Sequence, residues 1–151
     1  MNIPTGFAVD RTKTIIGALM HSGGVSAQDI AWLRREAFAD GDVSREAADE
    51  LFAVARAKVA KAAEWTAFFV EMITDHVVWQ SRPTGVLSES QAEWLIERAD
   101  ELKSVEALAV LVNVLAEAHR APAWFLSAVR TRAALGWPGV NEALAEAMLT
   151  A

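Results

Sequence analysis

Apolar residues recur at helical spacing along almost the whole chain. They return every three or four positions, which places them on one face of an α-helix. The pattern predicts about eight helices and no convincing strand. The gaps between helices are short, so neighbouring helices are expected to pack roughly antiparallel in an all-α bundle. The predicted helices span residues 12–21, 27–39, 45–62, 64–80, 89–102, 105–119, 122–135 and 139–150.

A short motif recurs before several of the predicted helices. When Trp32 is aligned with Trp94, GGVSAQDIAWL at 23–33 superimposes on GVLSESQAEWL at 85–95, with the shared pattern G-x-[VL]-S-x5-W-L. The segment ADGDVSREAADEL at 39–51 repeats the front of this motif. The recurrence predicts one domain over all 151 residues, built as a degenerate two-fold repeat with halves at about 12–62 and 74–135.

Each copy of the motif is expected to start a helix. Ser26, Ser44 and Ser88 can accept hydrogen bonds from the free amide groups of a first helical turn. Three residues after its serine, Gln91 completes a capping box, whereas Asp29 is a shorter imitation of one. The motif therefore predicts helix–loop–helix units.

The loop ADGDVS at 39–44 carries two aspartates around a glycine and raises the question of a calcium site. An EF-hand loop needs oxygen ligands at positions 1, 3, 5 and 12, with glycine at position 6. If Gly41 is position 6, only two of the four ligand positions hold an acid; the four residues are Glu36, Phe38, Asp40 and Ala47. We expect EF-hand-like geometry without a calcium ligand set.

The stretch FADGDVSREAADELFAVARA at 38–57 resembles the TerB-like tellurite-resistance family of small helical proteins. In that family such ADG-[IV]-S segments join helices in an EF-hand-like arrangement, often with a glutamate soon after the serine. Here Glu46 lies two positions after Ser44, and Ala47 stands where the family more usually has the acid. The resemblance implies a stress-related or scaffolding role more than a defined reaction.

The predicted helix 64–80 is apolar around most of its circumference, which is typical of a core helix. Glu64, Glu71 and Asp75 are exceptions that fall within about 40° of one another on the helix. One interpretation is a divalent-cation site, with Asp40 and Asp42 as helpers, because hard cations prefer clustered oxygen ligands. The other is a solvated face, since helix-bundle metal sites usually carry Glu-x-x-His pairs and the chain has none.

The tryptophans of the repeat, Trp32 and Trp94, lie about 100° away from the apolar stripe of their helices. Each can fill a groove against a neighbouring helix. Alternatively, the two can form a self-complementary dimer patch, because tryptophan is enriched at interface hot spots.

Composition excludes several classes of function. The chain has no cysteine, so disulfides, thiolate metal sites and cysteine nucleophiles are excluded. A net charge of −6 argues against nucleic-acid binding. The longest apolar run, residues 107–116, is well below the roughly 20 residues that span a membrane, so we expect no membrane insertion and a cytoplasmic protein.

The chain also lacks the sequence signatures of common active sites, including the nucleophile elbow, the phosphate-binding loop and the zinc-protease motif. We therefore expect a non-enzymatic intracellular interaction or scaffold domain of TerB-like character that binds a protein partner or itself as a homodimer. One alternative is a divalent-cation-binding stress protein, the cation being its one possible cofactor. Another is a carrier of an unidentified small apolar ligand, with a pocket lined by Phe68, Phe69 and Met72.

Overall fold

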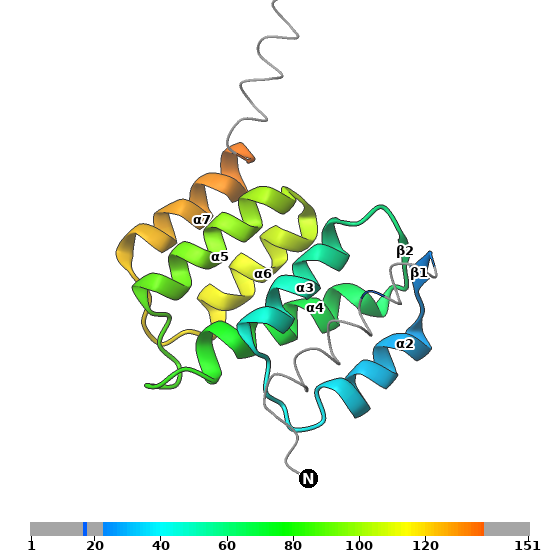
Figure 1. The fold of residues 1–151 in the computed structure, drawn as a ribbon. Coiled ribbons are helices and arrows are strands. Elements are labelled where there is room, and N and C mark those ends of the chain that lie inside the picture. The colour runs from blue at the N-terminus through cyan, green and yellow to red at the C-terminus, as the bar shows by residue number, and fades with distance from the viewer. Residues whose placement is uncertain (1–16, 18–22, 138–151) are drawn as a thin grey trace, which may run out of the picture.

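The computed structural model describes residue 17 and residues 23–137, and this part of the chain is mostly helical (Figure 1). The all-α class is thus confirmed for the described residues, with six α-helices in place of the expected eight. The helix predicted at 12–21 lies outside the described residues except for Gly17, and the one at 139–150 lies wholly outside them. The six are α2 (Ala27–Trp32), α3 (Arg45–Arg56), α4 (Glu64–Thr74), α5 (Glu89–Leu102), α6 (Val105–Glu117) and α7 (Ala123–Leu135).

The predicted serine caps are confirmed. Ser26, Ser44 and Ser88 each accept a hydrogen bond from the backbone amide three residues later. The capping box forms at Asp29, where the prediction placed it at Gln91. The Ser26 backbone amide donates to the Asp29 carboxylate at 2.9 Å and completes the box. The side-chain amide of Gln91 instead donates a hydrogen bond to Ser81 and accepts one from Arg45, because α5 starts close to other polar side chains.

Two helices end in a π-helical turn before they enter the motif. α2 continues into η1 (Leu33–Ala37), and α4 continues into η2 (Asp75–Trp79). In each loop that follows, the glycine adopts a positive φ, 77° at Gly41 and 81° at Gly85, which suits a residue without a side chain. The units α2–η1–α3 and α4–η2–α5 therefore share one plan, while the two-fold repeat aligned on the tryptophans stays a prediction.

The helix predicted at 45–62 is shorter than expected, and a small sheet replaces its end. α3 ends at Arg56, and β1 (Gly24–Val25) pairs in parallel with β2 (Ala60–Lys61). A Cβ atom at Gly24 would stand 3.0 Å from the Ala60 carbonyl oxygen, so glycine permits the close approach. Tertiary pairing here overrides a sequence that is compatible with helix.

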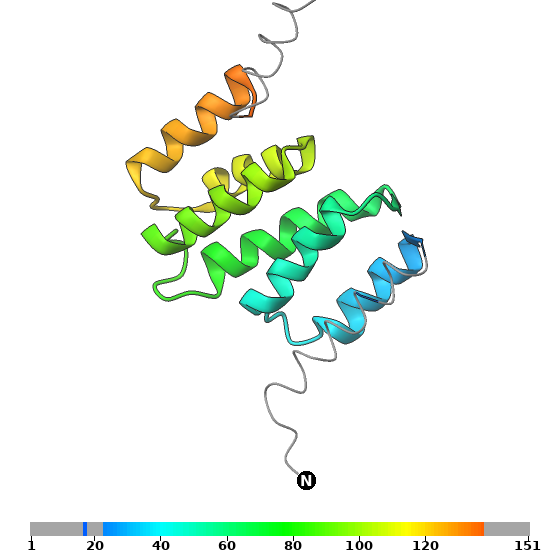
Figure 2. The same cartoon turned by 45° about the horizontal axis from the view of Figure 1, so that its top comes forward.

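The six helices form two layers. α2, α4 and α6 pack side by side in one layer, and α3, α5 and α7 lie in the other and run in one direction (Figures 1 and 2). The chain crosses from one layer to the other at each loop. Within its layer α4 packs most closely against α6, whereas α5 and α7 have their main contacts with α6 in the other layer.

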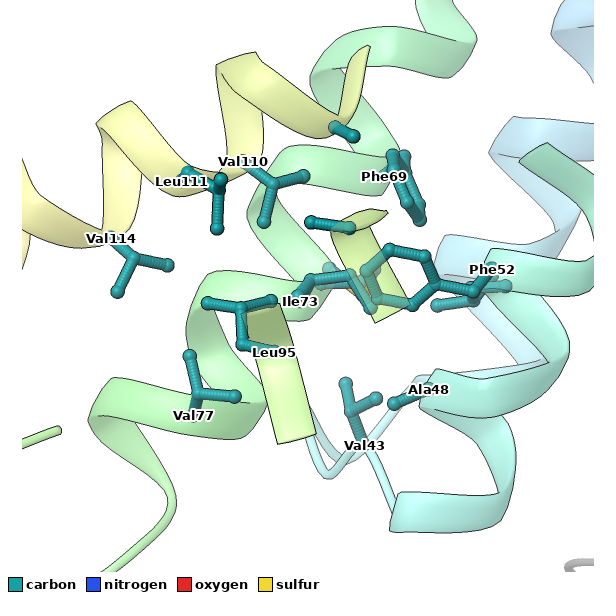
Figure 3. Close-up of a cluster of buried hydrophobic side chains, with 14 of the residues drawn as sticks. Val43, Ala48, Phe52, Phe69, Ile73, Val77, Leu95, Val110, Leu111 and Val114 are labelled. Atoms are coloured by element: carbon teal, nitrogen blue, oxygen red, sulfur yellow. The ribbon is translucent and has the colours of Figure 1, made fainter. Parts of the chain in front are cut away.

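The core fills the space between the layers (Figure 3). Phe69 is completely buried, with its ring centre 4.9 Å from that of Phe52 and 5.6 Å from that of Trp65. Phe68 and Met72 are also buried. This close packing counts against the pocket expected for an apolar-ligand carrier. Three grooves in the described part of the chain are lined by residues other than Phe68, Phe69 and Met72.

Candidate functional site

A polar groove lies between α4–η2 and α6. Its volume is about 510 Å³, and its polar lining comes from Glu71, Asp75, Asn113 and Glu117. Asn113 Nδ2 donates to the Glu117 carboxylate at 2.9 Å and to Thr74 Oγ1 at 2.8 Å. We call this the acidic groove. Sequence reasoning found its α4 side but missed its α6 side, because a helical wheel does not show which helix lies opposite.

The electrostatics of the acidic groove centre on Asp75. Burial raises the pKa of its carboxyl above the usual range, and the charges of Glu71 and Glu117 raise it further, while Arg34 opposes them. Arg34 Nη1 also lies 2.6 Å from a Glu71 carboxylate oxygen. One of the three carboxylates is thus already paired with a cation of the chain itself.

The structure does not gather the predicted metal ligands. Glu71 and Asp75 share the acidic groove, whereas Glu64 lines a separate groove beside Arg34. Glu64 and Asp75 share a helix face, yet eleven residues place them roughly 16 Å apart along the axis. Asp40 and Asp42 are exposed in their loop, where the Asp40 carboxylate accepts from the Asp42 amide at 3.1 Å. Within residues 23–137 no three acidic or histidine side chains meet as a metal site.

Four of the six tryptophans make the same kind of contact in this structure. Each donates its indole N–H to a carboxylate of another helix in the same layer, over distances of 2.7 to 3.2 Å. The polar atom of each indole is therefore satisfied, both in the buried Trp65 and Trp94 and in the exposed Trp79 and Trp124, and each contact joins two neighbouring helices. These indole–carboxylate pairs are Trp65 with Glu106, Trp79 with Glu117, Trp94 with Asp49, and Trp124 with Glu89.

Trp94 fills a groove between helices, as the first of the two interpretations expects. Its side chain is 7% exposed, and its ring lies edge-on to those of Phe52 and His76. It therefore has little surface left for a partner, because α3 and η2 cover the side that the helical wheel left open. Trp32 is half-buried against the core, and its interface role stays a prediction.

The ADGDVS loop is held by buried hydrogen bonds. His76 Nδ1 lies 2.8 Å from the Val43 carbonyl oxygen, and Arg45 Nε donates to His76 Nε2 at 3.1 Å. The Val43 backbone amide donates a hydrogen bond to Gln80 Oε1, and Gln80 Nε2 donates one to the Val43 carbonyl oxygen. Burial lowers the pKa of His76, and Arg45 lowers it further against the opposing effect of the Val43 carbonyl. Because Nε2 accepts a hydrogen bond from Arg45, the ring is neutral and the loop is tied to η2.

Large apolar side chains remain exposed mainly on α6 and α7. Val105 and Val112 on α6 are 85% and 49% exposed, and α7 contributes Trp124, Leu126 and Leu135. No helix in the described residues is long and apolar enough to cross a membrane. These side chains are most of the large apolar residues that are exposed in the described part of the chain.

Comparison of the chain with protein-family models, curated proteins and solved structures finds no match. The resemblance to the TerB-like family thus rests on residues 38–57 and on the helical organisation.

Proposed function

We propose that this protein is a non-enzymatic intracellular interaction or scaffold domain of TerB-like character that associates with copies of itself. The observation that supports the proposal is the exposed apolar surface of α6, led by Val105 and Val112. Scattered exposed hydrophobic residues are ordinary, but a contiguous apolar patch marks an interaction site.

The packing beneath this surface favours binding by a rigid body. The apolar residues of α6 that face inward are completely buried, and indole–carboxylate pairs join α6 to α4 and α7 to α5. A surface on a rigid support loses little conformational entropy when it binds. The exposed side chains can therefore contribute most of their burial energy to association.

Sedimentation velocity over a wide range of protein concentration tests the proposal. We expect the average mass to rise from that of the 16.4 kDa chain toward a multiple of it as concentration increases. A constant monomer mass at every concentration would contradict self-association.

The divalent-cation alternative ranks second. It would use the acidic groove, where Asp75 lies near Glu71 and Glu117. The Arg34–Glu71 ion pair already supplies a positive charge there, which reduces the attraction for a cation.

A further inference from the structure

Helix α6 is apolar around most of its circumference, and its polar residues all face one neighbour. Glu106 accepts from Trp65, Asn113 donates to Thr74, and Glu117 accepts from Trp79. All three contacts reach α4 or its continuation η2. The inward face is completely buried and consists of Ala107, Val110, Leu111 and Val114. The remaining face of α6 has no polar side chain to interact with water.

That remaining face is a single stripe. Val105, Ala109, Val112 and Ala116 are spaced by four, three and four residues, which places them within about 60° of one another on the helix. Both valines and Ala116 are exposed, and Ala109 is half-buried. We call these four residues the outer stripe. An apolar helix face normally packs against another surface, so the outer stripe calls for a covering surface.

We propose that the outer stripe of α6 packs against the outer stripe of a second copy, with the two helices antiparallel about a two-fold axis. This inference rests on the proposed self-association and names the surface that carries it. Large and small residues alternate along the stripe. In the antiparallel register, Val105 lies opposite Ala116 of the partner subunit, and Ala109 lies opposite Val112 of the partner subunit. Each valine thus meets an alanine, so the stripe is complementary to itself.

The charges at the ends of α6 favour the same arrangement. Lys103 is exposed at the N-terminal end of the helix, and Glu117 lies at its C-terminal end. Antiparallel pairing brings Lys103 to the same end of the helix pair as Glu117 of the partner subunit, and it places the helix dipoles in opposite directions. Parallel pairing would instead bring like charges together at each end. The outer stripe itself carries no charge that pairing would have to desolvate.

A charge placed in the stripe tests this surface. We expect Val112→Asp to weaken dimerisation by tenfold or more in sedimentation velocity, because the aspartate would be buried without a partner. Leu126→Asp is the matched control, since Leu126 is an exposed apolar residue on the neighbouring helix α7, at 40% against 49% for Val112. The control variant should dimerise like the wild type. Circular dichroism checks that both variants keep their helical content.

Cysteine cross-linking tests the register, because an introduced cysteine is the only thiol of its chain. A mixture of Val105→Cys and Ala116→Cys chains should form a disulfide-linked dimer under mild oxidation. Val105→Cys alone should not, since the two copies of residue 105 would lie about 16 Å apart along the antiparallel helices, beyond the reach of a disulfide. Efficient cross-linking of Val105→Cys to itself would overturn the antiparallel arrangement.

The remaining outcomes separate this inference from the proposed function. A wild-type dimer that Val112→Asp leaves intact would overturn the role of the outer stripe but keep self-association. A wild-type monomer at every concentration would overturn both. A wild-type monomer whose Val112→Asp variant also melts several degrees lower would mean that the chain itself covers the stripe, which overturns the inference.

Discussion

The guanidinium carbon of Arg45 lies 4.3 Å from the centre of the Trp94 ring, on its face. The same side chain donates to His76 in η2 and to Gln91 in α5. A residue in the first turn of α3 therefore ties three segments together at the ADGDVS loop. The loop whose aspartates suggested a metal is held by His76 and Gln80, which bond the Val43 backbone, and Arg45 joins His76 to Trp94.

Loss of Arg45 should weaken this junction. We expect Arg45→Ala to lower the free energy of unfolding by about 1–3 kcal/mol, because it removes a cation–π contact and side-chain hydrogen bonds. Arg35→Ala is the control, since Arg35 is exposed and pairs with its sequence neighbour Glu36; its effect should stay within about 0.5 kcal/mol. Urea unfolding measures both values, and equal losses would contradict the role of the junction.

The stability of the protein should fall as the pH falls below about 6.5. The pKa of His76 is lowered in the folded state, so the unfolded chain binds more protons in this range. The stabilisation from the neutral ring is complete above the unfolded pKa and is lost as pH falls toward the folded pKa. The free energy of unfolding, measured at intervals from about pH 7.5 to 5, should depend less steeply on pH for His76→Gln than for the wild type.

Indole–carboxylate pairs at buried and exposed positions should differ in their contribution to stability. Trp65 is 1% exposed and Trp124 is 37% exposed. We expect Trp65→Phe to cost about 2 kcal/mol or more, because it leaves a small cavity and removes the donor to Glu106. Trp124→Phe should cost less than about 1 kcal/mol, since water can replace the lost donor. Chemical denaturation compares the two, and a larger loss for Trp124→Phe would contradict this assignment.

Divalent cations should leave the melting temperature of EDTA-treated protein nearly unchanged. A cation at 100 times its dissociation constant would add about 2.7 kcal/mol, which means a shift of several degrees for a domain of this size. Differential scanning fluorimetry with millimolar magnesium, calcium, manganese and zinc provides the measurement. A shift with one ion that Asp75→Ala abolishes would restore the metal interpretation of the acidic groove.

Features set by neighbouring residues in the chain were predictable from sequence. The caps at Ser26, Ser44 and Ser88 depend on a bond to an amide three residues away, so the motif alone indicates them. The β1–β2 pairing was not predictable, because it joins two dipeptides that are 36 positions apart in the chain (Gly24 with Ala60) and carry no strand pattern.

The candidate site shows the same division between local and distant information. Helical periodicity gave the angles of Glu71 and Asp75 on α4, and both do line one groove. It could not show that Glu117 lies opposite or that Arg34 pairs with Glu71, because those contacts depend on how α6 and η1 lie against α4. The burial of Trp94 likewise depends on α3, whose Asp49 accepts its indole N–H.

The indole–carboxylate pairs also give the protein a set of internal optical reporters. One indole lies at the contact of α4 with α6, one at η2 with α6, one at α5 with α3, and one at α7 with α5. Indole emission shifts to longer wavelength when water reaches the ring. Variants that retain one of these tryptophans would therefore report, contact by contact, the order in which neighbouring helices within each layer come apart.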